Sequence, residues 1–252
     1  RDALRCNRAG CQNVAVGRNA LYSNTNGVGS VAVGLCALFC SNTNNNTAIG
    51  KLAGACVTSG NLNTAIGNAA LKGHDTTVTG NENTAVGYFA GGRISSGAYN
   101  IAIGSRTMCN MSSSSYNTAV GHNSQLTAST GAYNTTIGAN SLCCNNGGSC
   151  NTVLGYAAGR CDGSACQVTF VGMNAGSKNT ADSSTAVGFG SLANNTSCTG
   201  NTALGFCSLY ANTGANNTAV GNQALRNNTT ANGNVAVGNA AAIITTTGAN
   251  NI

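Results

Sequence analysis

The sequence contains no proline and no tryptophan, and only 6% of its residues are charged and 5% aromatic. Because proline and a three-residue glycine period are both missing, a collagen triple helix is excluded. Low charge combined with little side-chain bulk is typical of some disordered chains. Here, however, small apolar and β-branched residues recur at regular intervals, which favours an ordered fold.

The charge and hydropathy patterns also exclude two classes of partner. The net charge is +6, but the cations are scattered apart from Arg1, Arg5 and Arg8, whereas a nucleic-acid interface needs a clustered basic stripe with stacking aromatics. The longest obvious apolar run, Ala240 to Ile244, is far shorter than the roughly 18 residues of a membrane span. We therefore predict no nucleic-acid partner and no membrane insertion.

Residues that carry chemistry are scarce. The sequence has two histidines, His74 and His122, which lie far apart, and the His74-Asp75 pair has no nucleophile in phase with it to complete a triad. The four aspartates are too few for calcium-binding glycine-rich nonapeptides. We therefore expect no catalytic residue, no metal site and no cofactor, and we predict that both histidines lie on the surface.

What the sequence does contain is one unit repeated along its whole length. An Asn-Thr-Ala-Val-Gly-like motif occurs fourteen times, and of the thirteen intervals between its glycines nine are 17 residues, three are 16 and one is 20. The phase is kept up to both termini, so we expect a single array over residues 1–252, about fifteen coils cut within a repeat at each end. These repeat glycines are Gly17, Gly34, Gly50, Gly67, Gly87, Gly104, Gly121, Gly138, Gly155, Gly172, Gly188, Gly205, Gly221 and Gly238.

Positions within a unit are numbered here from its repeat glycine. Position −1 is always Val, Ile or Leu, position −3 is always Thr, Val or Ile, and positions −2 and −4 are mostly Ala and Asn. Such residues favour a short β-strand, which the glycine then ends. Position +3 is always Ala, Ser or Thr. We predict that each coil consists of a strand, a tight turn, a second short strand and a polar loop.

The alternation of strand side chains places positions −1 and −3 on one face and positions −2 and −4 on the other. Both faces are nearly free of charge, so one can line the interior of the coil, and the other needs a second surface, most simply another copy of the chain. Asparagines stacked at position −4 can form a side-chain amide ladder. The predicted fold is an all-β parallel β-solenoid, because 17 residues are too few for a helical repeat.

Among the units with Val or Ile at position −3 are Ser30 to Gly34, Asn100 to Gly104 and Asn234 to Gly238. They resemble the Ser-Val-Ala-Ile-Gly repeat of trimeric autotransporter adhesin heads. The fuller unit, Asn217 to Leu225, is similar to tandem repeats of phage tail-fibre and bacterial surface-fibre proteins. This resemblance covers the whole chain, although the repeat here is longer than in the adhesin heads. It implies a left-handed β-roll, a side-by-side homotrimer, and a location outside a cell or on a virion.

Thirteen cysteines in an extracellular chain indicate disulfides. Cys40 and Cys56 share position +6 in adjacent coils, which is within disulfide reach. Three further predicted bridges each close one loop, and they pair Cys6 with Cys11, Cys144 with Cys150, and Cys161 with Cys166. The odd total leaves at least one thiol free or bonded between chains, and the candidates at position +2 are Cys36 and Cys207.

Zinc is the competing interpretation of the cysteines. Cys36 and Cys40 fit the looser spacing of zinc ligands, but the tighter Cys-x2-Cys spacing is absent and the two histidines do not form a second ligand pair. We therefore favour disulfides over a metal.

The leading functional hypothesis is a structural extracellular fibre or fibre shaft that self-associates, as a homotrimer or a filament, without catalysis. The alternative is an adhesin or tail-fibre head whose variable loops bind cell-surface glycans. A third hypothesis is an ice-binding solenoid with a regular threonine column at position −3. That column is interrupted by Val14, Val31, Ile101 and Val235, which suits a buried column better than one in contact with water.

Overall fold

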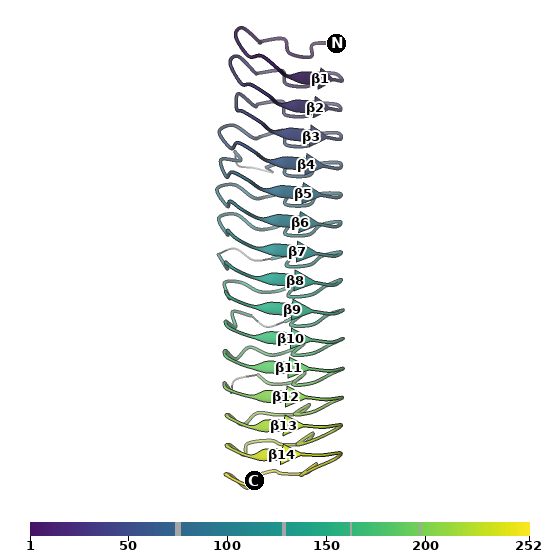
Figure 1. The fold of residues 1–252 in the computed structure, drawn as a ribbon, viewed down its shortest axis with the longest axis vertical. Coiled ribbons are helices and arrows are strands. Elements are labelled where there is room, and N and C mark those ends of the chain that lie inside the picture. The colour runs from purple at the N-terminus through teal and green to yellow at the C-terminus, as the bar shows by residue number, and fades with distance from the viewer. Residues whose placement is uncertain (74–76, 128–129, 162, 197) are drawn as a thin grey trace. The chain divides into compact units, whose positions relative to one another are not determined.

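The computed structural model covers residues 1–252 and describes residues 1–73, 77–127, 130–161, 163–196 and 198–252. The chain divides into two compact units, unit 1 (Arg1–Thr130) and unit 2 (Gly131–Ile252). Each unit is a parallel β-solenoid in which every coil contributes one short strand (Figure 1). The described residues contain no helix, so the predicted fold class is confirmed.

The strands coincide with positions −3 to −1 of the repeats. In unit 1 they are β1 (Val14–Val16), β2 (Val31–Val33), β3 (Thr47–Ile49), β4 (Thr64–Ile66), β5 (Thr84–Val86), β6 (Ile101–Ile103) and β7 (Thr118–Val120). In unit 2 they are β8 (Thr135–Ile137), β9 (Thr152–Leu154), β10 (Thr169–Val171), β11 (Thr185–Val187), β12 (Thr202–Leu204), β13 (Thr218–Val220) and β14 (Val235–Val237).

Within each unit the strands pair in chain order, in parallel and in exact repeat phase. Val31 of β2, for example, lies beside Val14 of β1, and Ala203 of β12 lies beside Ala186 of β11. The repeat glycine allows this close stacking. Gly104 has a φ of 129°, and a Cβ atom placed on it would lie 2.6 Å from the carbonyl oxygen of Gly121 in the next coil. A side chain at this position would collide with the backbone of the next coil.

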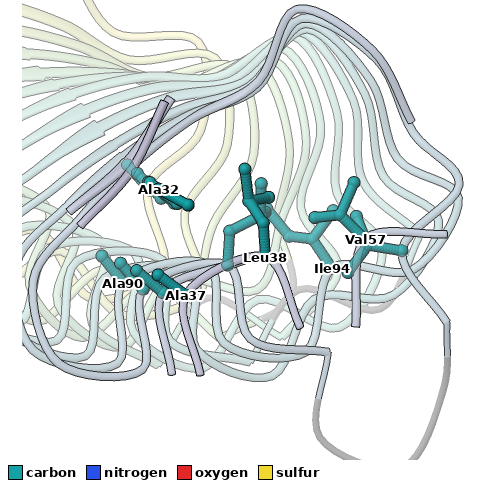
Figure 2. Packing of buried hydrophobic residues seen from close by; sticks show 14 of the residues in the cluster. Ala32, Ala37, Leu38, Val57, Ala90 and Ile94 are labelled. Atoms are coloured by element: carbon teal, nitrogen blue, oxygen red, sulfur yellow. The ribbon is translucent and has the colours of Figure 1, made fainter. Parts of the chain in front are cut away.

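The core lies inside the coils and is built from small side chains. In Figure 2, Ala32 at position −2 faces Ala37 and Ala90 at position +3 across the coil, while Leu38 and Ile94 fill the wider end. All five side chains are buried. The two walls are close together, so position −2 is alanine in eleven of the fourteen coils, and the bulkiest exception, Phe170, takes up the space left by Gly176.

The asparagines at position −4 stack in both units as predicted, but most of their bonds join a side chain to the backbone, and direct amide-to-amide bonds connect only some coils. In unit 1 the backbone N–H of Asn63 donates to Oδ1 of Asn46 at 2.8 Å, and that of Asn83 donates to Oδ1 of Asn63 at 2.9 Å. In unit 2 the N–H of Asn217 donates to Oδ1 of Asn201 at 2.9 Å. These side chains are buried, so the ladder satisfies polar groups that would otherwise be costly.

The prediction of a second short strand after the glycine is wrong. Positions +2 and +4 adopt positive φ angles in nearly every coil, as at Cys36 (56°) and Leu38 (48°), and so does position −5, as at Asn45 (56°). Left-handed conformations cost a non-glycine residue about 1–2 kcal/mol. The backbone still pairs between coils here, since the N–H of Leu38 donates to the carbonyl of Ala53 at 3.0 Å. Coil-to-coil hydrogen bonds therefore hold a turn, not a strand.

Candidate functional site

The outer surface of the strands carries the branched apolar side chains. Positions −1 and −3 are exposed or half-buried in every strand, whereas the middle residue is buried in all strands but β1. Val16 is 57% exposed and Ile103 is 39% exposed, while Ala102 between Ile101 and Ile103 is 1% exposed. The threonine column of position −3 thus lies on the outside of the single chain, so its burial would require a second surface. Which face points inward follows from the narrow interior.

Aromatic side chains extend this apolar surface in unit 2. At position +1 of consecutive coils stand Tyr156, Met173, Phe189 and Phe206, each close to half exposed. The rings of Phe189 and Phe206 stack with their centroids 5.4 Å apart and an interplanar angle of 11°. Because a continuous patch of large apolar side chains in contact with water is unfavourable, this ridge is a candidate interaction surface.

Unit 1 carries a different aromatic column, at position −5. The rings of Tyr99 and Tyr116 stack at 4.9 Å with an interplanar angle of 8°, and both side chains are exposed. Glu82 occupies the same position in the preceding coil. Its negative charge, followed by the influence of Tyr116, raises the pKa of Tyr99 above the ordinary tyrosine value.

Two neighbouring coils of unit 1 also enclose a surface hollow of about 270 Å³. It is lined by Tyr88, Phe89, Arg93, Arg106, Cys109 and Asn110. The coil register brings these residues together, because the N–H of Arg106 donates to the carbonyl of Tyr88 at 2.8 Å. Burial raises the pKa of the Cys109 thiol, and the nearby guanidinium of Arg106 offsets this only in part.

The cysteines form no disulfide in the structure, which describes all thirteen of them. The four predicted bridges are therefore not formed in it and stay predictions. The structure nevertheless places one predicted pair together. The N–H of Cys40 donates to the carbonyl of Ala55, directly before Cys56, at 3.0 Å. Burial and, to a smaller extent, the neighbouring Cys56 thiol raise the pKa of Cys40.

For the loop cysteines of unit 2 the register favours a different neighbour. The thiol of Cys161 contacts that of Cys144 in the preceding coil, although the sequence paired Cys144 with Cys150 and Cys161 with Cys166. The Cys166 thiol instead accepts a hydrogen bond from the N–H of Ser149 at 3.3 Å. Residues at the same position of adjacent coils are about one strand spacing apart, which explains why Cys144 and Cys161, both at position +6, are neighbours.

The remaining predicted sites are placed as follows. Cys36 lines a second hollow, of about 330 Å³, together with Cys40 and Cys56. Cys207 is buried, which raises its thiol pKa, and Cys6 and Cys11 lie in the first loop of unit 1. No cluster of metal ligands is found among the described residues, and no helix in that part of the chain is long and apolar enough to cross a membrane.

Only one of the two histidines is among the residues that the structure describes. His122 is exposed, as predicted. His74 and Asp75 lie outside the described residues.

Comparison with known proteins adds no family name. No model of a known protein family matches the chain, and no characterised protein matches it significantly. The function must therefore be inferred from the surfaces themselves.

Sequence reasoning missed the hollow around Arg93 and Arg106. Both arginines were counted among scattered cations. Their positions, +6 and +2 of adjacent repeats, carried no signal of contact, because the path of the chain after the repeat glycine was predicted as a strand.

Proposed function

We propose that this protein is a structural element of an extracellular fibre, whose solenoids associate side by side, as a homotrimer or filament, without catalysing a reaction. The single observation that carries the proposal is the exposed, uncharged strand face, which consists of the apolar column at position −1 and the threonine-rich column at position −3. A row of branched side chains such as Ile101 and Ile103, with no charged residue among them, is expected to be covered in the assembled state.

A second copy of the same chain is the occupant that fits this face best. The apolar columns repeat once per coil in both units. A copy of the chain carries the same columns at the same spacing, so apolar rows can interdigitate coil by coil. A partner without this period matches only a few coils. Repeated self-complementarity of this kind leads to symmetric oligomers or open filaments.

The test is the assembly state of the purified chain when the face is charged. Replacing Ile101 and Ile103 together with lysine (I101K/I103K) places two cations on the face, and we expect it to shift trimers or filaments to monomers in analytical ultracentrifugation and electron microscopy. Leu62→Lys is the matched control, since Leu62 is 54% exposed at position −5, away from the strand face. Wild-type protein that stays monomeric at all concentrations would refute the proposal.

A second candidate function is the binding of cell-surface glycans, as in an adhesin or tail-fibre head. The observation that favours it is the hollow where the exposed ring of Tyr88 and the half-buried ring of Phe89 line the same space as guanidinium and amide groups. Sites for small polar ligands combine apolar walls with a few hydrogen-bonding groups in this way. Screening the chain against a panel of immobilised glycans tests this function, and the absence of any bound glycan would contradict it.

Ice binding is a weaker third candidate. The threonine column does lie on the outer face, but apolar side chains such as Val14 and Ile101 interrupt it and are themselves exposed. A measurement of thermal hysteresis decides this point, and we expect none.

A further inference from the structure

We infer that the hollow lined by Arg93 and Arg106 in unit 1 is a binding site for one anionic sugar ring, carrying a carboxylate or a sulfate group. The inference rests on the second candidate function and adds to it a site and a ligand class.

The first argument is the convergence of two cations in one hollow. Arg93 follows strand β5 and Arg106 follows strand β6, and both line the same space. The ion pairs found among the described residues are those of Arg1 and Arg5 with Asp2, so no described carboxylate neutralises either arginine of the hollow. Arginine side chains hold carboxylate and sulfate-like groups through paired, charge-assisted hydrogen bonds.

The second argument is that no lining group competes as an anion. The hollow contains no aspartate or glutamate. Its thiol, Cys109, is buried, and burial raises the pKa of that thiol despite the opposing influence of Arg106. The thiol is therefore protonated at neutral pH, and the positive charge of the hollow is available to a ligand.

The third argument is the shape of the aromatic wall. Tyr88 is 57% exposed, and its ring lies 6.2 Å from that of Phe89 at an interplanar angle of 44°. The Phe89 ring packs over Gly92, where a Cβ atom would lie 2.5 Å from it. This glycine thus makes room for the ring beside Arg93. Two tilted rings at the edge of a charged hollow suit the apolar face of a sugar.

The size and polarity of the hollow set the class of ligand. A volume of about 270 Å³ lies just below the roughly 300–1,000 Å³ found for small-molecule sites, which limits the ligand to one ring. The side-chain amide of Asn110 offers a donor and an acceptor to sugar hydroxyls. An extended nucleic acid would need a longer basic track.

The experiment measures binding of the whole chain to three soluble probes by isothermal titration calorimetry. The probes are sialyllactose for the carboxylate, a galactose 6-sulfate derivative for the sulfate, and lactose as the uncharged sugar. We expect saturable binding of at least one anionic probe and binding of lactose at least about tenfold weaker. The comparison of the two anionic probes identifies which group the site prefers.

Variants then locate the site. Arg93→Ala and Arg106→Ala are each expected to weaken binding at least about tenfold, and Tyr88→Ala to weaken sugar binding but not the binding of inorganic sulfate. Arg18→Ala is the matched control, since Arg18 is an exposed arginine of the same unit outside the hollow, and it should leave the affinity within about twofold.

Three results would overturn the inference in distinguishable ways. If the wild-type chain binds no glycan at all, both the site and the second candidate function fail. If it binds anionic sugars equally well in the R93A/R106A double variant, only the site fails. If Arg18→Ala weakens binding as much as Arg93→Ala does, the attraction is a general effect of net charge, and the site again fails.

Discussion

The wide end of the coil is filled in two different ways, and the two units illustrate the contrast. In unit 1, Gly91 at position +4 is followed by Ile94 at position +7, which is buried and fills the space that a larger side chain at +4 would occupy. In unit 2, Leu209 at +4 fills that space, and Asn212 at +7 is buried as part of a second asparagine ladder. Side chains from different positions therefore fill the same part of the coil in the two cases.

The backbone is the same in both cases. The N–H of Ile94 donates to the carbonyl of Gly91 at 3.1 Å, and that of Asn212 donates to the carbonyl of Leu209 at 3.3 Å. The φ angles of Gly91 and Leu209 are 58° and 48°. The backbone of the coil thus follows the same path in both cases. In one case a small residue at position +4 is combined with a larger apolar residue at position +7, and in the other a leucine at position +4 is combined with an asparagine at position +7.

The combination of residues at positions +4 and +7 varies between coils of the same unit. Gly54 and Val57 in unit 1 follow the first solution, with Val57 buried and within van der Waals distance of a Cβ placed on Gly54. Gly176 in unit 2 is the informative exception, because Phe170 at position −2 takes up its space, with ring atoms 2.5 Å from such a Cβ. Volume conservation within a coil is what each solution obeys.

The largest expected loss of stability comes from combining glycine at position +4 with asparagine at position +7 in one coil. Ile94→Asn removes a buried side chain worth about 2–3 kcal/mol and buries an amide without a ladder partner, at a further cost of about 2–3 kcal/mol. We expect the free energy of unfolding, measured by urea denaturation, to fall by about 5 kcal/mol. Adding Gly91→Leu to this variant should restore part of the loss. Strictly additive effects would contradict the compensation between positions +4 and +7.

Breaking the ladder of unit 2 should have a somewhat smaller effect. Oδ1 of Asn212 accepts from Nδ2 of Asn228 at 2.7 Å, and its Nδ2 donates to the carbonyl of Gly214 at 2.6 Å. Asn212→Leu removes these two bonds and the bond to Oδ1 of Asn195, while Nδ2 of Asn228 keeps the carbonyl of Ala231 and the carbonyl of Gly214 keeps Nδ2 of Asn201. We therefore expect a loss of about 2 kcal/mol. Asn222→Leu is the control on the exposed surface and should change the stability by less than about 0.5 kcal/mol. Equal effects of the two variants would show that the ladder contributes nothing.

Extending the same ladder should stabilise the protein. Oδ1 of Asn228 is buried and has no hydrogen-bond partner among the described residues, because the next coil has Thr245 at position +7 in place of asparagine. Thr245→Asn supplies an amide donor, and we expect a gain of about 1 kcal/mol in the same denaturation assay. Thr245→Leu adds bulk without a donor, so a similar gain from it would argue against the hydrogen bond.

The smallest effect concerns the two aromatic columns on the outside. Glu82 raises the pKa of Tyr99, whereas the Phe189–Phe206 stack of unit 2 has no titrating group. Because the folded pKa lies above the unfolded one, any stability that this group contributes is present below the unfolded pKa and is lost as the pH rises through the folded value.

Titration of the tyrosinate absorbance measures whether Glu82 raises the pKa of Tyr99. Glu82→Gln should lower the pKa of Tyr99 toward its ordinary value, while Asp182→Asn in unit 2 should leave it unchanged. An unaltered Tyr99 titration in the Glu82 variant would show that the carboxylate is not the cause.

Much of the fold could be predicted from the sequence, because it depends on local patterns that repeat. The repeat glycines gave the coil length, and the residues before each glycine gave the place of each strand, such as Thr84–Val86, although position −4 lies outside the strand. The asparagine ladder at position −4 followed from stacking identical residues in register. Little of the candidate site could be predicted, since it is made by side chains such as Arg93 and Arg106 that no repeated pattern relates.

By itself, then, the sequence determined the period, the strand positions and the parallel register, since each follows from the alternation of side chains and from glycine. Only the tertiary structure decided which strand face points inward, because alternation defines two faces but not the width of the coil that must enclose one of them. It alone decided which residues adopt positive φ angles, because hydrogen bonds between coils there outweigh the backbone preferences of residues such as Leu38. It also decided which thiols and which arginines meet, since that depends on the path of the chain across neighbouring coils.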